Sequence, residues 1–238
     1  MKTIYASSLQ LLRQMKQDLM LTVIAFVPFL TGAAFRIIIP VTERLLTDYI
    51  GVGAFIAPYY KLIDLFLIII TPSMFNYVVA MVILEEADDH MAVCLAVTPL
   101  GKTGYLLSRL GVAGLVSFPV SILIAAIFRL SDMDIPTIAC VALAGTVQGV
   151  AAALLIVAMS TNKVEGMAVG KMATLVNVGA FAPYFISGKA QYFLSFLPSF
   201  WMAKAIQPGN YFMLIISVLL AVLWMVLLSV KFMRKITG

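Results

Sequence analysis

Long apolar runs, each about the length of a bilayer crossing, are the feature that most limits how this chain can fold. A helix crosses the hydrocarbon core of a membrane with about 20 apolar residues. Runs of this kind occupy residues 19–39, 62–84, 103–130, 136–160, 167–187 and 210–231. Hydrophobic residues make up 63% of the 238 residues and charged residues only 11%, which excludes an ordinary soluble domain. We therefore predict an integral membrane protein with six transmembrane spans.

The pattern inside the runs favours helices over a membrane barrel. Apolar residues follow one another continuously, whereas barrel strands alternate between apolar and polar side chains. Only helices and closed barrels satisfy the backbone in lipid. No clear repeat and no long linker divides the chain. The prediction is an all-α fold in a single transmembrane domain covering residues 1–238.

Basic residues indicate the orientation. With six crossings both termini lie on one side, which carries ten Lys and Arg residues against six on the other. An excess of Lys and Arg marks cytoplasmic loops. We expect both termini, the segment 85–102 and the loop Thr161–Gly166 in the cytoplasm. The net charge of +5 is dispersed, which suits anionic membrane lipid and not nucleic acid.

Two segments outside the runs have unusual patterns. Residues 1–18 place Tyr5, Leu9 and Leu12 at helical spacing, which predicts an amphipathic helix on the membrane surface. The alternative is a plain extension of the first span. Residues 188–209 are too apolar for a free loop and too interrupted by Pro and Gly for a span. They predict a short re-entrant helical segment before the last span, with an ordinary loop anchored by aromatic residues as the alternative.

A polar island after the second run is the strongest functional signal. The island is residues 85–90, which hold four of the eleven acidic residues of the chain, and the Thr98-Pro99-Leu100 bend follows closely. The island suggests a solvent-facing elbow, residues 85–102, that grips a soluble partner. The competing interpretation is a solvated acidic turn. Its candidate contact residues are Glu85, Glu86, Asp88, Asp89, Leu95, Thr98, Pro99 and Leu100.

Catalysis by this chain has little support. Gly101-Lys102-Thr103 resembles the end of a phosphate-binding loop, but that loop needs a Gly where Ala96 stands. The one histidine, His90, directly follows Asp88 and Asp89, but sequence neighbours do not share one helix face and a metal site needs several converging ligands, so we predict no metal site. No His lies within a run to activate a nucleophile. We expect a transport subunit without cofactors of its own.

Polar and small residues inside the runs are further candidates. Arg36 and Asp64 are expected to pair across the first two spans, or else to reach the membrane interface separately. Asn76, Gln148 and Asn177 are expected either on a substrate path or in hydrogen bonds between helices, the second being favoured. Gly145-x-x-x-Gly149 and Gly166-x-x-x-Gly170 predict close helix approach, with dimerisation as a further option.

The layout resembles the permeases of type-2 ABC exporters. The resemblance rests on Ile83-Leu84-Glu85-Glu86, on Leu95-Ala-Val-Thr-Pro-Leu100 and on the return into the membrane at Tyr105-Leu106-Leu107. Similar small permeases serve drug export and antibiotic resistance, including proteins described as fluoroquinolone exporters. The residues His90–Cys94 are less basic than the corresponding stretch of that family.

This resemblance implies partners and a location. The elbow would dock in a groove of an ABC ATPase subunit, which would bind ATP and Mg. Lys163 and Glu165 would form a second contact with that subunit. A second permease copy or homologue would complete a dimer in the bacterial inner membrane.

The expected function is therefore export of a hydrophobic or amphipathic substrate, such as a drug, a peptide or a lipid-like molecule. The apolar spans and scattered amides do not choose among these classes. Two alternatives remain. One is a secondary carrier, and the other is a membrane-embedded assembly or sensing subunit without transport activity.

Overall fold

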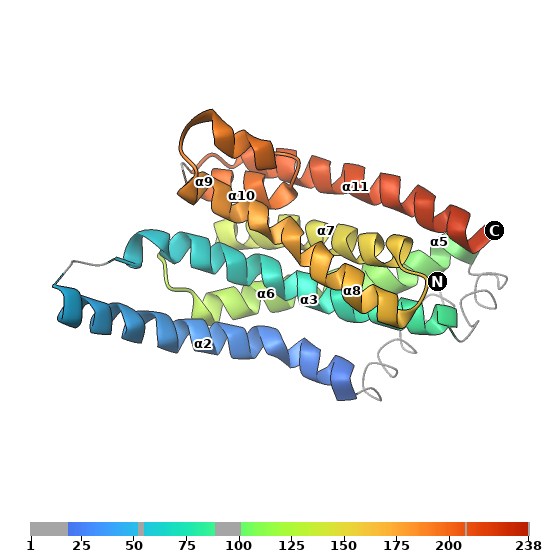
Figure 1. Cartoon of the computed structure of the whole chain (residues 1–238), viewed down its shortest axis with the longest axis horizontal. Coiled ribbons are helices and arrows are strands. Elements are labelled where there is room, and N and C mark those ends of the chain that lie inside the picture. Colours follow the sequence, from blue (N-terminus) through green and yellow to red (C-terminus); the bar gives the residue numbers. More distant parts are fainter. Residues whose placement is uncertain (1–18, 52–54, 89–100, 208, 238) are drawn as a thin grey trace.

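The computed structural model describes residues 19–51, 55–88, 101–207 and 209–237, and these fold into helices without strands. The long elements are α2 (Leu19–Ile50), α3 (Tyr60–Asp88), α6 (Val112–Phe128), α7 (Ile135–Met159) and α11 (Phe212–Thr237). The shorter ones are η1 (Ala57–Tyr59), α5 (Gly101–Leu106), η2 (Leu107–Gly111), α8 (Lys163–Ala173), η3 (Thr174–Phe181), α9 (Ala182–Phe185), η4 (Gly188–Leu194) and α10 (Pro198–Ile206). The long helices lie roughly side by side, with α2 along one edge (Figure 1). The predicted surface helix, residues 1–18, falls outside the described residues.

Five helices in the described part of the chain are long and apolar enough to cross a membrane. They cover Phe26–Tyr49, Ala57–Asp88, Gly104–Phe128, Ile135–Met159 and Phe212–Phe232. The all-helical, multi-pass membrane class is thus confirmed. Five of the six predicted spans have a matching helix, with ends within a few residues of prediction except for α2.

The predicted span 167–187 is not one regular helix. It consists of α8, the 3-10 helix η3 and the short helix α9. The path nevertheless runs along the bundle from one end toward the other (Figure 1). η3 lies close to α10, because a Cβ at Gly179 would stand 2.6 Å from the Ser199 hydroxyl oxygen. That hydroxyl donates to the Val176 carbonyl at 2.5 Å. The break therefore coincides with a contact that holds α10 in place.

Helix α2 continues eleven residues past its predicted end at residue 39, through Pro40 to Ile50. Its distal part has a specific attachment to the next helix. The Glu43 carboxylate accepts a hydrogen bond from the Ala57 amide at 2.9 Å and another from the Tyr60 hydroxyl. A carboxylate near a helix start satisfies amide groups that have no partner within the helix. The extension of α2 thus fixes the start of α3.

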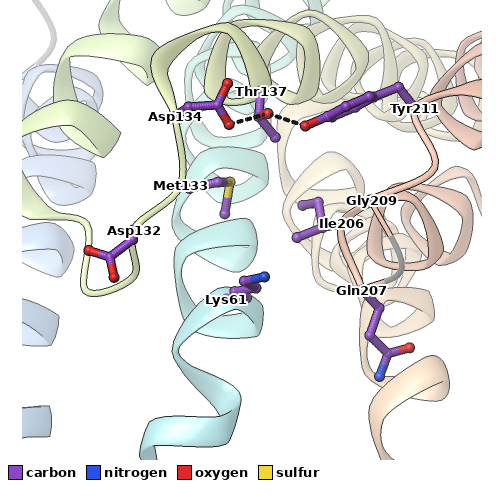
Figure 2. A pocket seen from close by; sticks show the side chains of 9 residues that line it. All are labelled: Lys61, Asp132, Met133, Asp134, Thr137, Ile206, Gln207, Gly209 and Tyr211. Atoms are coloured by element: carbon purple, nitrogen blue, oxygen red, sulfur yellow. Dashed lines mark hydrogen bonds between the residues drawn. The ribbon is translucent and has the colours of Figure 1, made fainter.

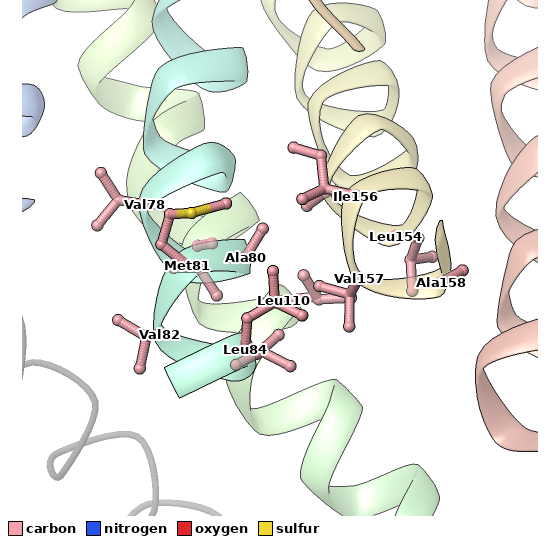
Figure 3. Packing of buried hydrophobic residues seen from close by; sticks show 14 of the residues in the cluster. Val78, Ala80, Met81, Val82, Leu84, Leu110, Leu154, Ile156, Val157 and Ala158 are labelled. Atoms are coloured by element: carbon pink, nitrogen blue, oxygen red, sulfur yellow. The ribbon is translucent and has the colours of Figure 1, made fainter. Parts of the chain in front are cut away.

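Helix α3 is the centre of the fold. Its sequence is apolar on every side, as expected for a helix surrounded by others. At one end it packs against η2 and α7 through a cluster that includes Met81, Leu84, Leu110 and Val157 (Figure 3). At the other end Leu65, Ile68 and Ile69 join a second buried cluster with α7 and α10.

The proline in α3 is compensated by a neighbouring helix. Pro72 has no amide hydrogen to donate to the Ile68 carbonyl, four residues earlier. The Ser121 hydroxyl of α6 donates to that carbonyl at 2.8 Å, and Ser121 is fully buried. A backbone acceptor that would be unsatisfied in lipid therefore has a partner.

Both small-residue motifs pack against α3. A Cβ at Gly149 would lie 2.9 Å from the Pro72 carbonyl oxygen, so α7 approaches the kink as closely as glycine allows. A Cβ at Gly170 would meet the Tyr77 ring at 2.5 Å, and one at Gly166 would meet Leu84 at 2.2 Å. The predicted close approach is confirmed, and within the described residues it joins helices of one chain.

The segment 188–209 contains two short helices, as its interrupted pattern suggests. η4 has no buried residue, whereas α10 buries Phe200, Met202 and Ala203 among others. α10 packs against α11, where the Ser217 hydroxyl donates to the Pro198 carbonyl at 2.8 Å. Its position relative to a membrane stays a prediction.

Candidate functional site

A buried charge cluster joins the last turn of α3 to the start of the next span. Glu86 is 1% exposed and Arg109 is 0% exposed. The Glu86 Oε2 atom accepts from the Tyr105 hydroxyl at 2.7 Å and from Arg109 Nε at 3.1 Å, while Oε1 pairs with Arg109 Nη2. Two parallel bonds between a guanidinium and a carboxylate fix both position and orientation. We call Glu86, Tyr105 and Arg109 the elbow clamp.

The backbone at the elbow clamp departs from regular helix. Arg109 lies in the π-helical turn η2, between α5 and α6. Single π turns inside helices occur often at functional sites. The Arg109 guanidinium also lies 5.7 Å from the centre of the Tyr105 ring, at a cation–π distance. The elbow clamp therefore ties the two ends of the elbow, residues 85–102, to each other inside the protein.

The same end of α3 is tied to α8 by a second, more exposed contact. Lys163 Nζ donates to Glu85 Oε2 at 2.9 Å, and the Lys163 amide donates to Asp88 Oδ2 at 3.0 Å. The Lys163 and Glu85 side chains are 24% and 47% exposed. Exposed ion pairs contribute about 0–1 kcal/mol. Lys163 thus positions the start of α8 beside the elbow more than it stabilises the fold.

Glu165 caps its own helix. Asn162 is the residue before α8, and its side-chain oxygen accepts from the Glu165 amide at 2.8 Å. The Glu165 carboxylate in turn accepts from the Thr161 amide at 2.5 Å and from the Thr161 hydroxyl at 2.7 Å. This reciprocal arrangement resembles a capping box. The predicted second partner contact therefore lies on a well-defined helix start.

The predicted elbow residues fall into two groups. Glu85, Glu86 and Asp88 bind groups of their own chain, which favours anchoring of the elbow over direct ion pairs with a partner. The other predicted contacts lie outside the described residues, namely Asp89, Leu95, Thr98, Pro99 and Leu100. Their docking role stays a prediction.

The expected ion pair between Arg36 and Asp64 does not form in the structure. Asp64 accepts from the Leu130 amide at 2.8 Å and from the Ser131 amide at 2.7 Å. Arg36 donates to the Arg129 carbonyl. Both side chains therefore bind the short connection between α6 and α7, because its unpaired backbone groups offer neutral partners to each charge.

Two of the three predicted buried amides bind each other. Gln148 Nε2 donates to Asn177 Oδ1 at 2.7 Å and joins α7 to η3. Asn76 Nδ2 donates to the Pro72 carbonyl within α3 at 2.8 Å. All three side chains are buried. This geometry favours the interpretation as hydrogen bonds between and within helices over an open substrate path.

Sequence reasoning missed Tyr105 and Arg109. Arg109 counted only as a charge that sets orientation, although it lies inside a predicted span. An ionisable residue within a span is a functional candidate by default, and that rule could have identified it. Its partner Glu86, 23 positions earlier, could not be chosen over the adjacent Glu85 without knowing which face of α3 is buried.

Comparison with known proteins gives a consistent set of relatives. A family model described as "Fluoroquinolones export permease protein Rv2686c-like" matches residues 11–229. Two relatives come from Mycobacterium tuberculosis: the Fluoroquinolones export permease proteins Rv2686c, from strain ATCC 25618 / H37Rv, and MT2760, from strain CDC 1551 / Oshkosh. Each is 28% identical to this chain over 194 residues, covering 79% of this chain and 74% of the relative. No solved structure matches the chain.

Proposed function

The chain belongs to the Rv2686c-like family of fluoroquinolones export permeases, and from this premise we propose that it is the transmembrane subunit of an ATP-driven exporter. In this proposal a separate ABC ATPase subunit binds ATP and Mg and hydrolyses the nucleotide. The permease carries a drug-like amphipathic substrate out of the cytoplasm. It acts in the inner membrane with both termini in the cytoplasm.

The elbow clamp is the observation that carries the proposal. Helix α3 ends at Asp88 and α5 begins at Gly101, and Glu86, Tyr105 and Arg109 hold these two ends together. A loop that only connected two spans would need no buried bidentate ion pair at its base. Burying two charges costs free energy, which a close and fully hydrogen-bonded geometry must offset. The clamp supports a role in which the elbow must not move independently of the bundle.

A firmly held elbow would convert movement of a soluble partner into movement of helices. Through the elbow clamp, a displacement of the elbow acts on α3 and on the span that begins at α5. Through Lys163, the same displacement acts on α8. Rigid-body shifts of packed helices are a common way to change access to a site. A coupling role thus accounts for contacts that concentrate at one end of the bundle.

The proposal includes a second copy of the permease. α3 fills the middle of the bundle, and its side chains are packed against α6, α7 and α10. One bundle of this size therefore uses its interior for its own core. Two bundles facing each other can enclose a path wide enough for a drug-sized molecule.

The test replaces a predicted docking residue and measures coupling. The chain is produced together with a candidate ABC ATPase subunit from the same organism and purified through a tag on the permease. We expect Leu95→Asp to reduce recovery of the ATPase strongly, because a charge in a docked apolar surface loses its water. Lys189→Ala, in the exposed helix η4, is the control. Undiminished recovery and drug export with Leu95→Asp would contradict the coupling role.

A further inference from the structure

Two adjoining cavities open at the end of the bundle opposite the elbow. Their volumes are about 330 Å³ and 760 Å³, and Lys61, Asp132 and Gln207 line both. We call the space lined by these residues and their neighbours the distal vestibule. In Figure 2 its walls come from α3, from the connection before α7 and from the segment between α10 and α11. Sites for drug-sized ligands have volumes of about 300–1,000 Å³.

The walls of the distal vestibule are held by specific contacts. Asp64 binds the backbone of Leu130 and Ser131, immediately before Asp132. On the other side, the Thr137 hydroxyl donates to Asp134 Oδ1 at 2.6 Å and is 2.8 Å from the Tyr211 hydroxyl (Figure 2). The Thr137 hydrogen bond lowers the pKa of the Asp134 carboxyl below its usual value, so this wall stays negative further into the acid range.

The distal vestibule presents two opposite charges that remain available. Lys61 and Asp132 are both exposed. Among the described residues, neither side chain has a hydrogen bond or an ion pair with another residue, although both line the same cavities. A cation and an anion in one cavity match a ligand that carries both charges at some distance from each other. A ligand with a single charge would pair with only one of Lys61 and Asp132, and the second side chain would be hydrated but have no ion pair.

Aromatic side chains complete the larger cavity. Tyr59, Tyr60 and Tyr184 line it, and Tyr59 stacks on Phe185 with 5.3 Å between ring centres. The Tyr184 hydroxyl is buried and has no hydrogen-bond partner. A buried polar group without a partner costs about 1–3 kcal/mol. A ligand acceptor placed beside it would remove that cost, and the flanking rings suit a planar ligand.

We propose that the distal vestibule binds a zwitterionic, ring-bearing small molecule, with its carboxylate at Lys61, its ammonium group at Asp132 and its ring against Tyr59 and Tyr60. Tyr184 donates a hydrogen bond to the bound molecule. This inference rests on the proposed export function, because it identifies the vestibule as a binding site for the exported molecule. It narrows the substrate from amphipathic molecules in general to zwitterions.

The experiment measures binding to the full-length permease in lipid nanodiscs. The probes are the zwitterion ciprofloxacin, its methyl ester, which lacks the carboxylate, and its N-acetyl derivative, which lacks the ammonium group. The variants are Lys61→Gln, Asp132→Asn and Tyr184→Phe. Lys189→Gln and Asp48→Asn are the controls, since both replace exposed charges that do not line the vestibule.

The expected result is a loss that depends on both the variant and the probe. Lys61→Gln should weaken ciprofloxacin binding about tenfold and leave binding of the ester unchanged, because a charged hydrogen bond is lost only with the acid. Asp132→Asn should weaken the binding of ciprofloxacin to the same extent and leave the binding of the N-acetyl derivative unchanged. Tyr184→Phe should weaken the binding of all three probes, whereas both control variants should bind the probes like the wild-type chain.

The outcome separates this inference from the proposed function. The vestibule would be overturned as a zwitterion site if all variants bound the probes equally, or if Lys61→Gln weakened binding of the ester, or Asp132→Asn binding of the N-acetyl derivative, as much as binding of ciprofloxacin. Drug efflux from cells that produce the wild-type chain and its ATPase is measured in parallel. Efflux that persists in Lys61→Gln and Asp132→Asn would also overturn the inference and leave the export function standing. Specific binding with no efflux by the wild-type chain would leave the site standing and remove the export function.

Discussion

At the scale of single residues, adjacent carboxylates do different work. Glu85 faces water and holds the start of α8, whereas Glu86 is buried against Arg109. The 100° turn between neighbouring positions of a helix is enough to separate these environments. The sequence indicates that this pair of acids matters, but it does not indicate which member is inside.

Removing one member of the buried pair should destabilise the protein. Glu86→Gln removes the carboxylate that pairs with the buried Arg109 guanidinium, and removing one partner of a buried ion pair costs about 3–5 kcal/mol. We expect a marked fall in the thermal unfolding midpoint of the purified permease in detergent. Glu85→Gln is the matched control. Its loss of folding stability should stay within about 1 kcal/mol, because the ion pair of Glu85 is exposed.

The double variant Glu86→Gln/Arg109→Met separates charge from packing. It should recover part of the lost stability, since the buried guanidinium is removed together with the Glu86 carboxylate. Equal unfolding midpoints for Glu86→Gln and Glu85→Gln would argue against a buried charge pair at the elbow base.

At the scale of elements, most of the fold follows from the length and position of the apolar runs. α6, α7 and α11 lie where the runs place them because continuous apolar residues leave the chain no alternative to a buried or lipid-facing helix. The 3-10 stretch of the fifth run could not be predicted. It depends on the contact of Gly179 and Val176 with α10, which is distant in sequence.

The candidate site was predicted less completely. The acidic island includes Glu86 but predicted a solvent-facing contact and not a buried ion pair, and Tyr105 and Arg109 follow only from the packing of α5 and η2 against α3. The sequence left open whether Arg36 and Asp64 pair, because sequence position gives the depth of a residue and not its competing backbone partners. For the same reason, nothing in the sequence joined Lys61 to Asp132 in one cavity.

The hydrogen bond from Ser121 to the Ile68 carbonyl, which Pro72 leaves without a partner in α3, gives a prediction for one hydroxyl. Ser121→Ala leaves the Ile68 carbonyl without its hydrogen bond, and hydrogen bonds between membrane helices contribute about 0.6–2 kcal/mol. The unfolding midpoint should fall by a corresponding, small amount. Ser229→Ala is the control, since this exposed hydroxyl donates within its own helix. A larger fall in the unfolding midpoint for Ser229→Ala than for Ser121→Ala would contradict a stabilising hydrogen bond from Ser121 to the Ile68 carbonyl.

The approach of α7 to α3 gives a sharper prediction. Gly149→Ala places a methyl group 2.9 Å from the Pro72 carbonyl oxygen and 3.0 Å from the Asn76 amide nitrogen, so the backbones must separate. Overpacking of this kind costs about 1–3 kcal/mol. Gly114→Ala should be tolerated, because its nearest neighbours would lie at 3.5 and 3.6 Å. Chemical denaturation of both variants in detergent provides the measurement, and equal stability would contradict the close contact.

At the scale of the whole molecule, the two ends of the bundle differ in kind. The end of α3 and the start of α8 lie at one end of the bundle (Figure 1), where the elbow clamp is. The start of α3 lies at the other end, where Lys61, Asp132 and Tyr184 line the distal vestibule. In an exporter driven by a soluble partner, the partner moves the helices at one end of the bundle and the substrate leaves at the other end. The positive-inside rule predicts that the elbow end faces the cytoplasm.

Cysteine labelling in intact cells tests that assignment. In a background with Cys94→Ser and Cys140→Ser, Ala87→Cys reports the elbow end and Ser187→Cys reports the opposite end; both positions are exposed. A membrane-impermeant thiol reagent should label Ser187→Cys in intact cells, because that end faces outward. Ala87→Cys should react only after the cells are permeabilised. Labelling of Ala87→Cys in intact cells would place the elbow outside. An elbow in that position could not meet a cytoplasmic ATPase, and the coupling role would fail while the helical fold remained unchanged.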